Sequence, residues 1–131
     1  MSLPGSPTFI QEQYSYWSNQ QAETVPLCRV TPLNAAEVAA TLLVTSFFQC
    51  PFAVKSGGHA AFVGASNIQG GITIDLLNLS QVQVSADKTL TKVGAGNRWF
   101  DVYSKLDTQQ LSVIGGRVAG IGVGGLTLGG E

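Results

Sequence analysis

Charged side chains are scarce in this chain of 131 residues, making up 11% of it, against roughly 25% in an average soluble domain. Seven Lys and Arg residues stand against eight Asp and Glu residues, and the formal net charge is −1. No basic surface is therefore predicted, which argues against nucleic acid or an anionic membrane as a partner. Two interpretations of the low charge stay open: a well-buried single domain, or a piece whose apolar surface another surface covers.

Cysteine and histidine are also rare. Cys28 and Cys50 are too few for a disulfide framework, they form no C-x-x-C pair, and His59 is the only histidine. A typical metal site draws on three or four such ligands. The sequence therefore predicts two buried free thiols and no metal site.

Long apolar runs are missing as well. The longest, around LLVTSFF, is far shorter than the ~20 residues of a membrane-spanning helix. The first residues, MSLPGSPTFIQEQYSYWSNQQ, have neither the positive charge nor the apolar stretch of a signal peptide. We expect a soluble, cytoplasmic chain with a loose leader at residues 1–16, where Pro4 and Pro7 stand, and a single packed domain at residues 17–131.

Helix and strand signals are present from residue 34 onward. Asn34 followed by Glu37 is typical of a helix N-terminus and predicts a helix over residues 34–49, ending before Pro51. A second helix is predicted from Asn97, with an apolar face of Trp99, Val102, Tyr103 and Leu106. Strands are predicted at 52–55, 71–76, 81–85, 90–96 and 112–114, with a hairpin turn at 86–88. This order indicates an α+β domain of small mixed sheets flanked by helices.

Glycine is abundant, with 16 residues gathered mainly in two segments, KSGGHAAFVGAS (55–66) and GGRVAGIGVGGLTLGGE (115–131). The first follows a predicted strand, and a glycine turn there brings backbone N–H groups close to a ligand such as a phosphate. Ser56 would add a hydroxyl donor. The second segment would form an opposing loop, so that the two grip a pyrophosphate. Plain tight turns explain the same composition, and the residues alone leave both interpretations open.

Two apparent motifs are weak. GIGVGG at residues 120–125 matches the G-x-G-x-x-G of Rossmann folds, but no acidic residue follows about 20 positions later and no βαβ unit surrounds it, so we reject that interpretation. His59 is ambiguous, because a lone histidine is commonly a structural residue. Neither Asp75 nor Asp101 has a spacing that ties it to His59 in a catalytic triad. An imidazole on a glycine turn is also a nucleophile that can bond to a bound cofactor.

Four ordered stretches carry a specific resemblance: PFAVKSGGHAAFVGAS, GGITIDLLNLSQVQV, VGAGNRWFDVYSKL and GGRVAGIGVGGLTLGG. Together they resemble the FAD-binding domain of vanillyl-alcohol-oxidase-type (PCMH-type) flavoproteins, and among these the berberine-bridge-enzyme-like oxidases of fungi. The resemblance covers nearly the whole chain from about Trp17. It implies an α+β FAD-binding lobe that is truncated relative to the family, with the pyrophosphate over the SGGH turn and no substrate domain.

The resemblance also implies particular cofactor residues. His59 stands where relatives bond the 8α-methyl carbon of the flavin. Val118 stands where many relatives have a second attachment through cysteine, so at most one covalent bond, through His59, is expected. The residues expected to bind FAD are Lys55, Ser56, Gly57, Gly58, His59, Ala60, Ser66, Val118, Gly122, Gly124, Gly125 and Gly130. No catalytic base is identified.

The activity implied by the resemblance is hydride transfer from a small-molecule substrate, such as a sugar or a secondary metabolite, to FAD, with reoxidation by O2. A second chain or a second copy is expected to complete the site, because relatives run on well beyond the second glycine segment. Two alternatives stay open. One is a truncated relative that acts as a non-redox isomerase or cyclase in a homodimer, and the other is a non-catalytic module that binds FAD or a partner.

Overall fold

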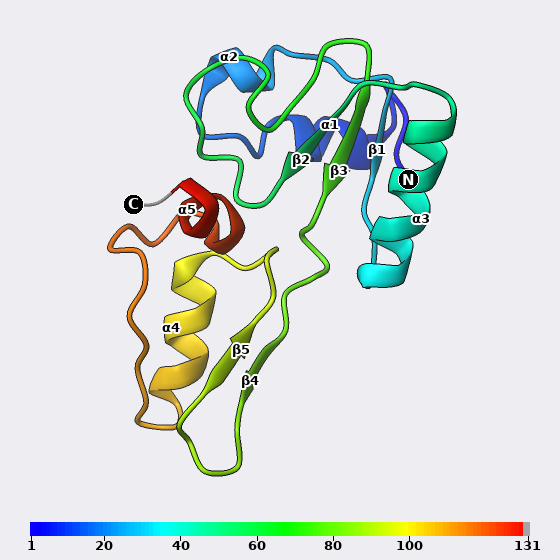
Figure 1. Ribbon diagram of the computed structural model, residues 1–131. Helices are drawn as coiled ribbons and strands as arrows, with labels where there is room; N and C mark the ends of the chain where they lie inside the picture. Colours follow the sequence, from blue (N-terminus) through cyan, green and yellow to red (C-terminus); the bar gives the residue numbers. More distant parts are fainter. Residues whose placement is uncertain (130–131) are drawn as a thin grey trace.

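The chain folds into two small sheets with helices around them (Figure 1). The computed structural model describes residues 1–129. The parallel sheet has the order β1 (Cys28–Val30), β3 (Ile72–Asp75), β2 (Phe52–Lys55), and the antiparallel hairpin pairs β4 (Val82–Val84) with β5 (Thr91–Val93). The helices are α1 (Pro7–Gln13), α2 (Asn19–Ala22), α3 (Ala35–Phe47), α4 (Trp99–Asp107) and α5 (Val123–Gly129). The predicted mixture of small sheets and helices is confirmed.

The two crossovers of the parallel sheet differ in kind. Helix α3 connects β1 to β2, as parallel strands commonly require. Residues 56–71 connect β2 to β3 without forming a helix or a strand, and we call them the crossover loop. Long connections without regular structure are uncommon in compact domains and often functional. The SGGH segment lies at the start of this loop, directly after the buried end of β2.

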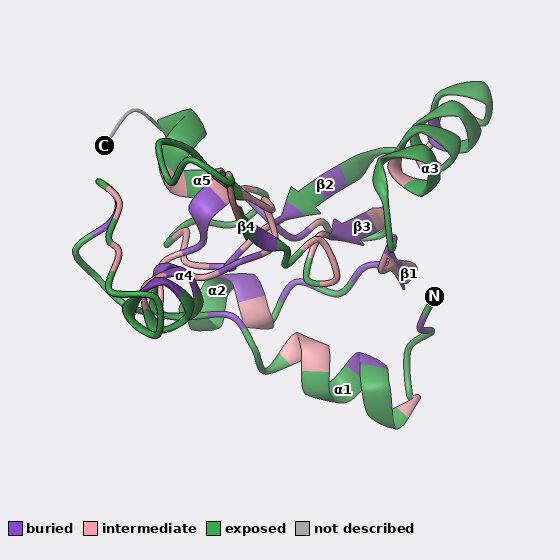
Figure 2. Cartoon of the chain, turned by 90° about the horizontal axis from the view of Figure 1, so that it is seen from below, coloured by how far each residue is buried: buried purple, intermediate pink, exposed green. Residues whose placement is uncertain are grey.

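Helix α3 begins where the sequence predicts and is apolar on its outside. Asn34 Oδ1 accepts a hydrogen bond from the N–H of Glu37 at 3.0 Å, which caps the helix. Figure 2 shows α3 and α1 on opposite sides of the parallel sheet, with α3 largely exposed. Its exposed side chains include Leu43 and Phe47. Even so, none of the helices within residues 1–129 is both long enough and apolar enough to cross a membrane.

The main core lies between α4 and the hairpin. Trp99, Val102 and Leu106 of α4 are buried together with Val82 of β4 and Val123 of α5, and Tyr103 packs against them. The apolar face predicted for this helix is thus confirmed. Because α5 joins this core, its position relative to the hairpin is fixed by packing.

Residues 1–16 are packed and do not form the loose leader that the sequence predicts. Pro7 begins α1, which Ser6 caps by accepting the N–H of Phe9 at 3.3 Å. A proline suits the first position of a helix, since its missing N–H has no partner there anyway. The side chains of Phe9 and Tyr16 are buried. The start of the chain therefore belongs to the fold.

Three further predictions differ from the structure. Residues 112–114 form no strand. The glycine-rich end, predicted as a loop, forms helix α5, whose Val123 and Leu126 pack on the α4 core and offset the poor helix propensity of glycine. Cys28 and Cys50 are free, as predicted, but they are half-buried rather than buried.

Candidate functional site

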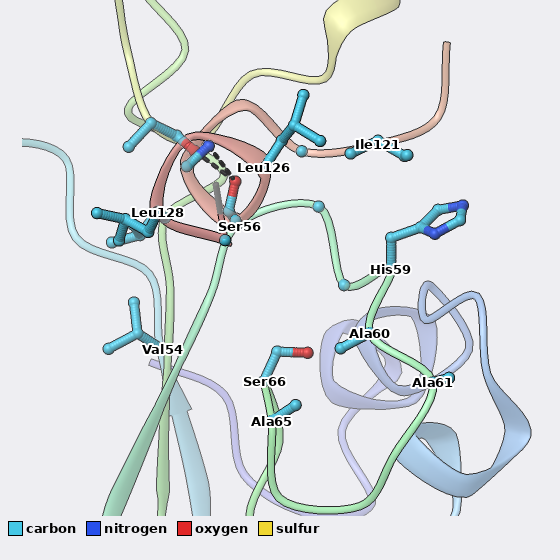
Figure 3. A pocket seen from close by; sticks show the side chains of 18 of the residues that line it. Val54, Ser56, His59, Ala60, Ala61, Ala65, Ser66, Ile121, Leu126 and Leu128 are labelled. Atoms are coloured by element: carbon cyan, nitrogen blue, oxygen red, sulfur yellow. Dashed lines mark hydrogen bonds between the residues drawn. The ribbon is translucent and has the colours of Figure 1, made fainter. Parts of the chain in front are cut away.

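A cavity of about 690 Å³ lies between the crossover loop and α5 (Figure 3). This volume is within the range of small-molecule sites. The cavity is lined by residues 56–62, 65–66, 121–122, 124–126 and 128–129, together with Val54, Leu76 and Ala95. None of these residues carries a charged carboxylate, ammonium or guanidinium group. An anion in this cavity would therefore depend on backbone and hydroxyl donors.

Most of the residues expected to bind a cofactor line this cavity. These are Ser56, Gly57, Gly58, His59, Ala60, Ser66, Gly122, Gly124 and Gly125. Lys55 and Val118 do not line it, and Val118 is exposed elsewhere on the surface. Gly130 lies outside the described residues. The structure thus brings both glycine segments to one cavity.

Lys55, which the sequence assigns to cofactor binding, is held in the core and does not line the cavity. Its Nζ lies 2.7 Å from Oδ2 of Asp75, and the two side chains are only 5% and 0% exposed. The ammonium group also contacts Ser15 Oγ at 2.8 Å and lies over the ring of Tyr16. A buried charge is costly unless it is paired and hydrogen-bonded. The pairing with Asp75 thus explains why Lys55 is not available to a ligand.

Ser56 does not offer the free hydroxyl donor that the sequence suggests. Its hydroxyl donates to the carbonyl of Ala95 at 2.6 Å and accepts the N–H of Gly124 at 3.2 Å (Figure 3). A hydroxyl has a single hydrogen, so its donor is already used. Ser56 instead ties the start of the crossover loop to α5.

The two glycine segments touch at Gly57 and Gly122. A Cβ atom on Gly57 would lie 2.4 Å from the backbone nitrogen of Gly122, and one on Gly122 would lie 2.2 Å from that of Gly57. Real Cβ atoms essentially never come closer than 3.0 Å to such atoms. Neither position has space for a side chain. The next residue, Gly58, has φ +68°, a left-handed conformation that favours glycine.

Backbone N–H groups of the crossover loop are left without partners. Among the described residues, no N–H of residues 57–67 donates to a hydrogen bond, whereas the next one, of Ile68, does. Gly57 and Gly58 are nevertheless buried. The hydroxyl of Ser66 is also buried without a partner, and Ser66 lines the cavity. Buried donors are normally paired, and successive free N–H groups form a binding site for anions such as phosphate.

His59 projects from the loop, and it lines the cavity together with Ile121 of the second glycine segment (Figure 3). Its ring stacks on the indole of Trp17, with ring centroids 4.9 Å apart and planes inclined by 16°. The backbone N–H of Trp17 donates to the carbonyl of Gly58 at 3.0 Å. The only imidazole of the chain is thus oriented by an aromatic neighbour, which sequence reasoning did not identify because no local pattern connects the two positions.

Tyr16 and Arg29 form a buried polar cluster against the crossover loop. The Tyr16 hydroxyl accepts a hydrogen bond from Arg29 Nη1 at 2.8 Å and donates to the carbonyl of Ser66 at 3.0 Å. Arg29 is fully buried and has no carboxylate partner within residues 1–129, but its guanidinium lies over the rings of Phe9 and Tyr16. Burial raises the pKa of Tyr16 to about 12, although the hydrogen bond from Arg29 acts in the opposite direction.

The raised pKa of Tyr16 should make the free energy of unfolding decrease as the pH rises from 10 towards 12. The unfolded phenol releases its proton near pH 10.0, whereas the folded one keeps it until about pH 12. In this interval the folded state binds more protons, so the free energy of unfolding decreases with rising pH. Urea denaturation across the interval should show a steeper decrease for the wild type than for Tyr16→Phe. Parallel curves for the two proteins would contradict the raised pKa.

Comparison with known sequences identifies relatives over most of the chain. A sequence model described as FAD binding domain matches residues 26–131. The chain is 46% identical over 115 residues to the FAD-dependent monooxygenase tpcD of Cochliobolus heterostrophus, covering 88% of this chain and 22% of that protein. It is 41% identical over 128 residues to the FAD-dependent monooxygenase prx3 of Penicillium roqueforti, covering 97% and 25%. The chain spans about a quarter of the length of these curated relatives.

Solved structures share the fold at lower sequence identity. The 6-hydroxy-D-nicotine oxidase of Arthrobacter nicotinovorans superposes with a TM-score of 0.83 and 21% identity, over 95% of this chain and 27% of that one. The BBE-like 1 protein of Physcomitrella patens gives a TM-score of 0.82 and 19% identity, over 97% and 28%. The FAD-binding fold that the resemblance implies is therefore confirmed.

Proposed function

This chain belongs to the FAD-binding-domain family, and on that premise we propose that it is the flavin-binding lobe of an oxidoreductase that acts on a small molecule. FAD is the cofactor that membership of the family implies. The observation that carries the proposal is the cavity, because residues 57–62, 65 and 66, whose N–H groups have no partner among the described residues, line it. A diphosphate requires donors of this kind, and the cavity supplies them without any charged side chain.

The residues present fit FAD in two respects. The N–H groups of Gly57, Gly58 and His59 and the hydroxyl of Ser66 can bind phosphate oxygens. The apolar side chains of Val54 and Leu126 line the rest of the cavity and suit a flat aromatic ring system. Bound FAD supplies a hydride acceptor, and the protein's part is to position it and to exclude competing reactions.

The proposal includes O2 as the final oxidant and a substrate such as a secondary metabolite or a sugar. Two fungal relatives with more than 40% identity are named FAD-dependent monooxygenases, which supports a reaction that uses oxygen. Among the residues that the structure describes, the lining offers no acidic or basic side chain besides His59 that could accept a proton from a substrate. We therefore place the catalytic base on polypeptide that covers the cavity from outside.

That covering polypeptide is a second chain or a second copy of this one. Phe62 and Leu128 both line the cavity, yet these residues are 66% and 90% exposed. Apolar residues at the edge of a site favour contact with another surface. The exposed apolar side of α3, with Leu43 and Phe47, is a further surface of the same kind.

Titration of the purified chain with FAD tests the proposal. We expect saturable binding that shifts the flavin absorption bands and quenches flavin or tryptophan fluorescence, because the donors are already in place. Circular dichroism on the same sample establishes that the chain is folded. A folded chain that leaves the flavin spectrum unchanged at all concentrations would overturn the proposal and favour the non-redox alternatives.

Replacement of His59 by alanine should abolish covalent attachment of FAD. His59 is the only nucleophilic nitrogen side chain in the lining, and the lining contains no cysteine. Neutral imidazole is a competent nucleophile near neutral pH. The measurement is the intact mass after acid precipitation, which should show an FAD-sized increment in the wild type and none in His59→Ala. An increment that persists in the variant, or is absent from flavin-loaded wild type, contradicts this role.

A further inference from the structure

The crossover loop is held on one side by residues 16–21, which we call the clamp segment. Four of the loop's carbonyl groups accept hydrogen bonds from it. Gly58 accepts from the N–H of Trp17 at 3.0 Å, Ala61 from Ser18 Oγ at 2.8 Å, Phe62 from Gln21 Nε2, and Ser66 from Tyr16 Oη at 3.0 Å. None of the loop's N–H groups between residues 57 and 67 donates a hydrogen bond to any residue that the structure describes. In this stretch the backbone of the loop thus uses its carbonyl groups as acceptors towards the clamp segment and leaves its N–H groups unused.

The geometry of the peptide bond relates the direction of these fixed carbonyl groups to the direction of the free N–H groups. In a trans peptide the C=O of one residue and the N–H of the next point in opposite directions, and no cis peptide occurs within residues 1–129. Fixing the carbonyls of Gly58 and Ala61 on the clamp segment therefore turns the N–H groups of His59 and Phe62 away from it. His59 and Phe62 line the cavity, whereas no residue of the clamp segment does. The freed N–H groups therefore point away from the clamp segment, on a stretch of the loop whose residues line the cavity.

We propose that the clamp segment positions the loop for the diphosphate of FAD, by holding carbonyls on the outer side so that a row of N–H groups faces the phosphate oxygens. This inference rests on the function proposed above. Within residues 1–129 the cavity lining has no carboxylate, ammonium or guanidinium group, so a diphosphate there depends on neutral donors such as these N–H groups and the hydroxyl of Ser66. Tyr16 and Gln21 are buried, so the arrangement exists before the ligand binds, which reduces the ordering that binding requires.

Ser18→Ala tests the clamp with little risk to the fold. The Ser18 side chain is half-buried, and its hydroxyl donates only to Ala61. Ser46→Ala is the matched control, because Ser46 is exposed on α3 and lies outside the cavity. We expect Ser18→Ala to weaken the binding of inorganic pyrophosphate and of FAD by about three- to ten-fold, the usual effect of losing one hydrogen bond. Ser46→Ala should bind both ligands like the wild type.

A second pair of variants and a second readout separate positioning from a general loss of structure. Tyr16→Phe removes the hydrogen bond to Ser66 together with the one that Arg29 donates to the same hydroxyl, and Tyr14→Phe, at an exposed tyrosine, is its control. Amide chemical shifts in the chain without flavin report the contact itself. On addition of pyrophosphate, the N–H signals of His59 and Phe62 should move in the wild type and move less in Ser18→Ala, at unchanged melting temperature.

The outcomes distinguish this inference from the proposed function. If the wild type binds FAD, and Ser18→Ala and Tyr16→Phe bind pyrophosphate and FAD just as tightly, the clamp is overturned while the proposed function stands. If affinity falls only together with the melting temperature, the clamp is also overturned, since the effect is then on folding. If the wild type binds neither FAD nor pyrophosphate, both proposals fail.

Discussion

Replacing Gly57 by alanine should lower the free energy of unfolding by about 2–3 kcal/mol, because overpacking a tight contact costs about this much. The same substitution should abolish FAD binding. The added methyl carbon would lie 2.4 Å from the backbone nitrogen of Gly122, and backbone cannot move aside as a flexible side chain can. The contact is reciprocal, so Gly122→Ala should give a similar loss. In either variant the loop and α5 must separate, which pulls apart the two walls of the cavity.

Gly120→Ala is the control for this pair. A Cβ at Gly120 would meet only Arg98 Nη1, at 3.9 Å, and Gly120 does not line the cavity. Its stability should stay within about 0.5 kcal/mol of the wild type, as for most surface substitutions. Urea denaturation gives the free energies and titration with FAD gives the affinities. Wild-type stability in Gly57→Ala would show that the close contact between the two walls is not present in solution.

Removal of either member of the Lys55–Asp75 pair should destabilise the fold by about 3–5 kcal/mol, because the remaining charge is left buried without a partner. The two charged atoms are 2.7 Å apart, and neither side chain reaches solvent appreciably. Lys55→Met leaves the carboxylate of Asp75, which then keeps only the N–H of Leu77 as a hydrogen-bond donor at 3.1 Å. Asp75→Leu leaves the ammonium group of Lys55 with Ser15 and the ring of Tyr16.

The double variant Lys55→Met/Asp75→Leu makes this prediction specific to pairing. It should be more stable than either single variant, because no unpaired charge remains in the core. Lys92→Met, at an exposed lysine of β5, controls for the loss of a positive charge and should change stability by less than about 0.5 kcal/mol. Chemical denaturation of the wild type and these four variants gives the free energies of unfolding to be compared. Strictly additive losses in the double variant would mean that the two charges do not stabilise each other.

Elements with local signals could be predicted from the sequence, and elements that depend on distant contacts could not. Strand β2 occupies the predicted residues, and α3 begins at its predicted cap, Asn34. Helix α5 was missed because its glycines favour a loop, whereas packing of Val123 and Leu126 on the α4 core decides the outcome. Strand β1 was missed because it is short and contains Arg29, whose burial depends on Phe9 and Tyr16.

In the candidate site, too, features with a local sequence signal could be predicted, whereas features that depend on distant contacts could not. The glycine turns and His59 were predicted, since glycine pairs and a lone imidazole are visible in the sequence. The ion pair of Lys55 was not predicted, because its partner Asp75 becomes its neighbour only through the register of β2 against β3. The clamp segment was missed for the same reason, since Ser18 and Gln21 contact loop residues more than forty positions away. Such contacts have no local spacing that a sequence pattern could reveal.

The bond between Ser56 and Gly124 spans 68 positions, and this sets an order of events during synthesis. At a translation rate of about 5–20 residues per second, the second wall of the cavity emerges roughly 3–14 s after the first. During that interval the clamp segment and the crossover loop can already form, because the strand that follows the loop ends at Asp75. The nascent chain therefore contains the crossover loop first, without the opposing wall of the cavity. The complete cavity can bind the cofactor only after α5 has been synthesised.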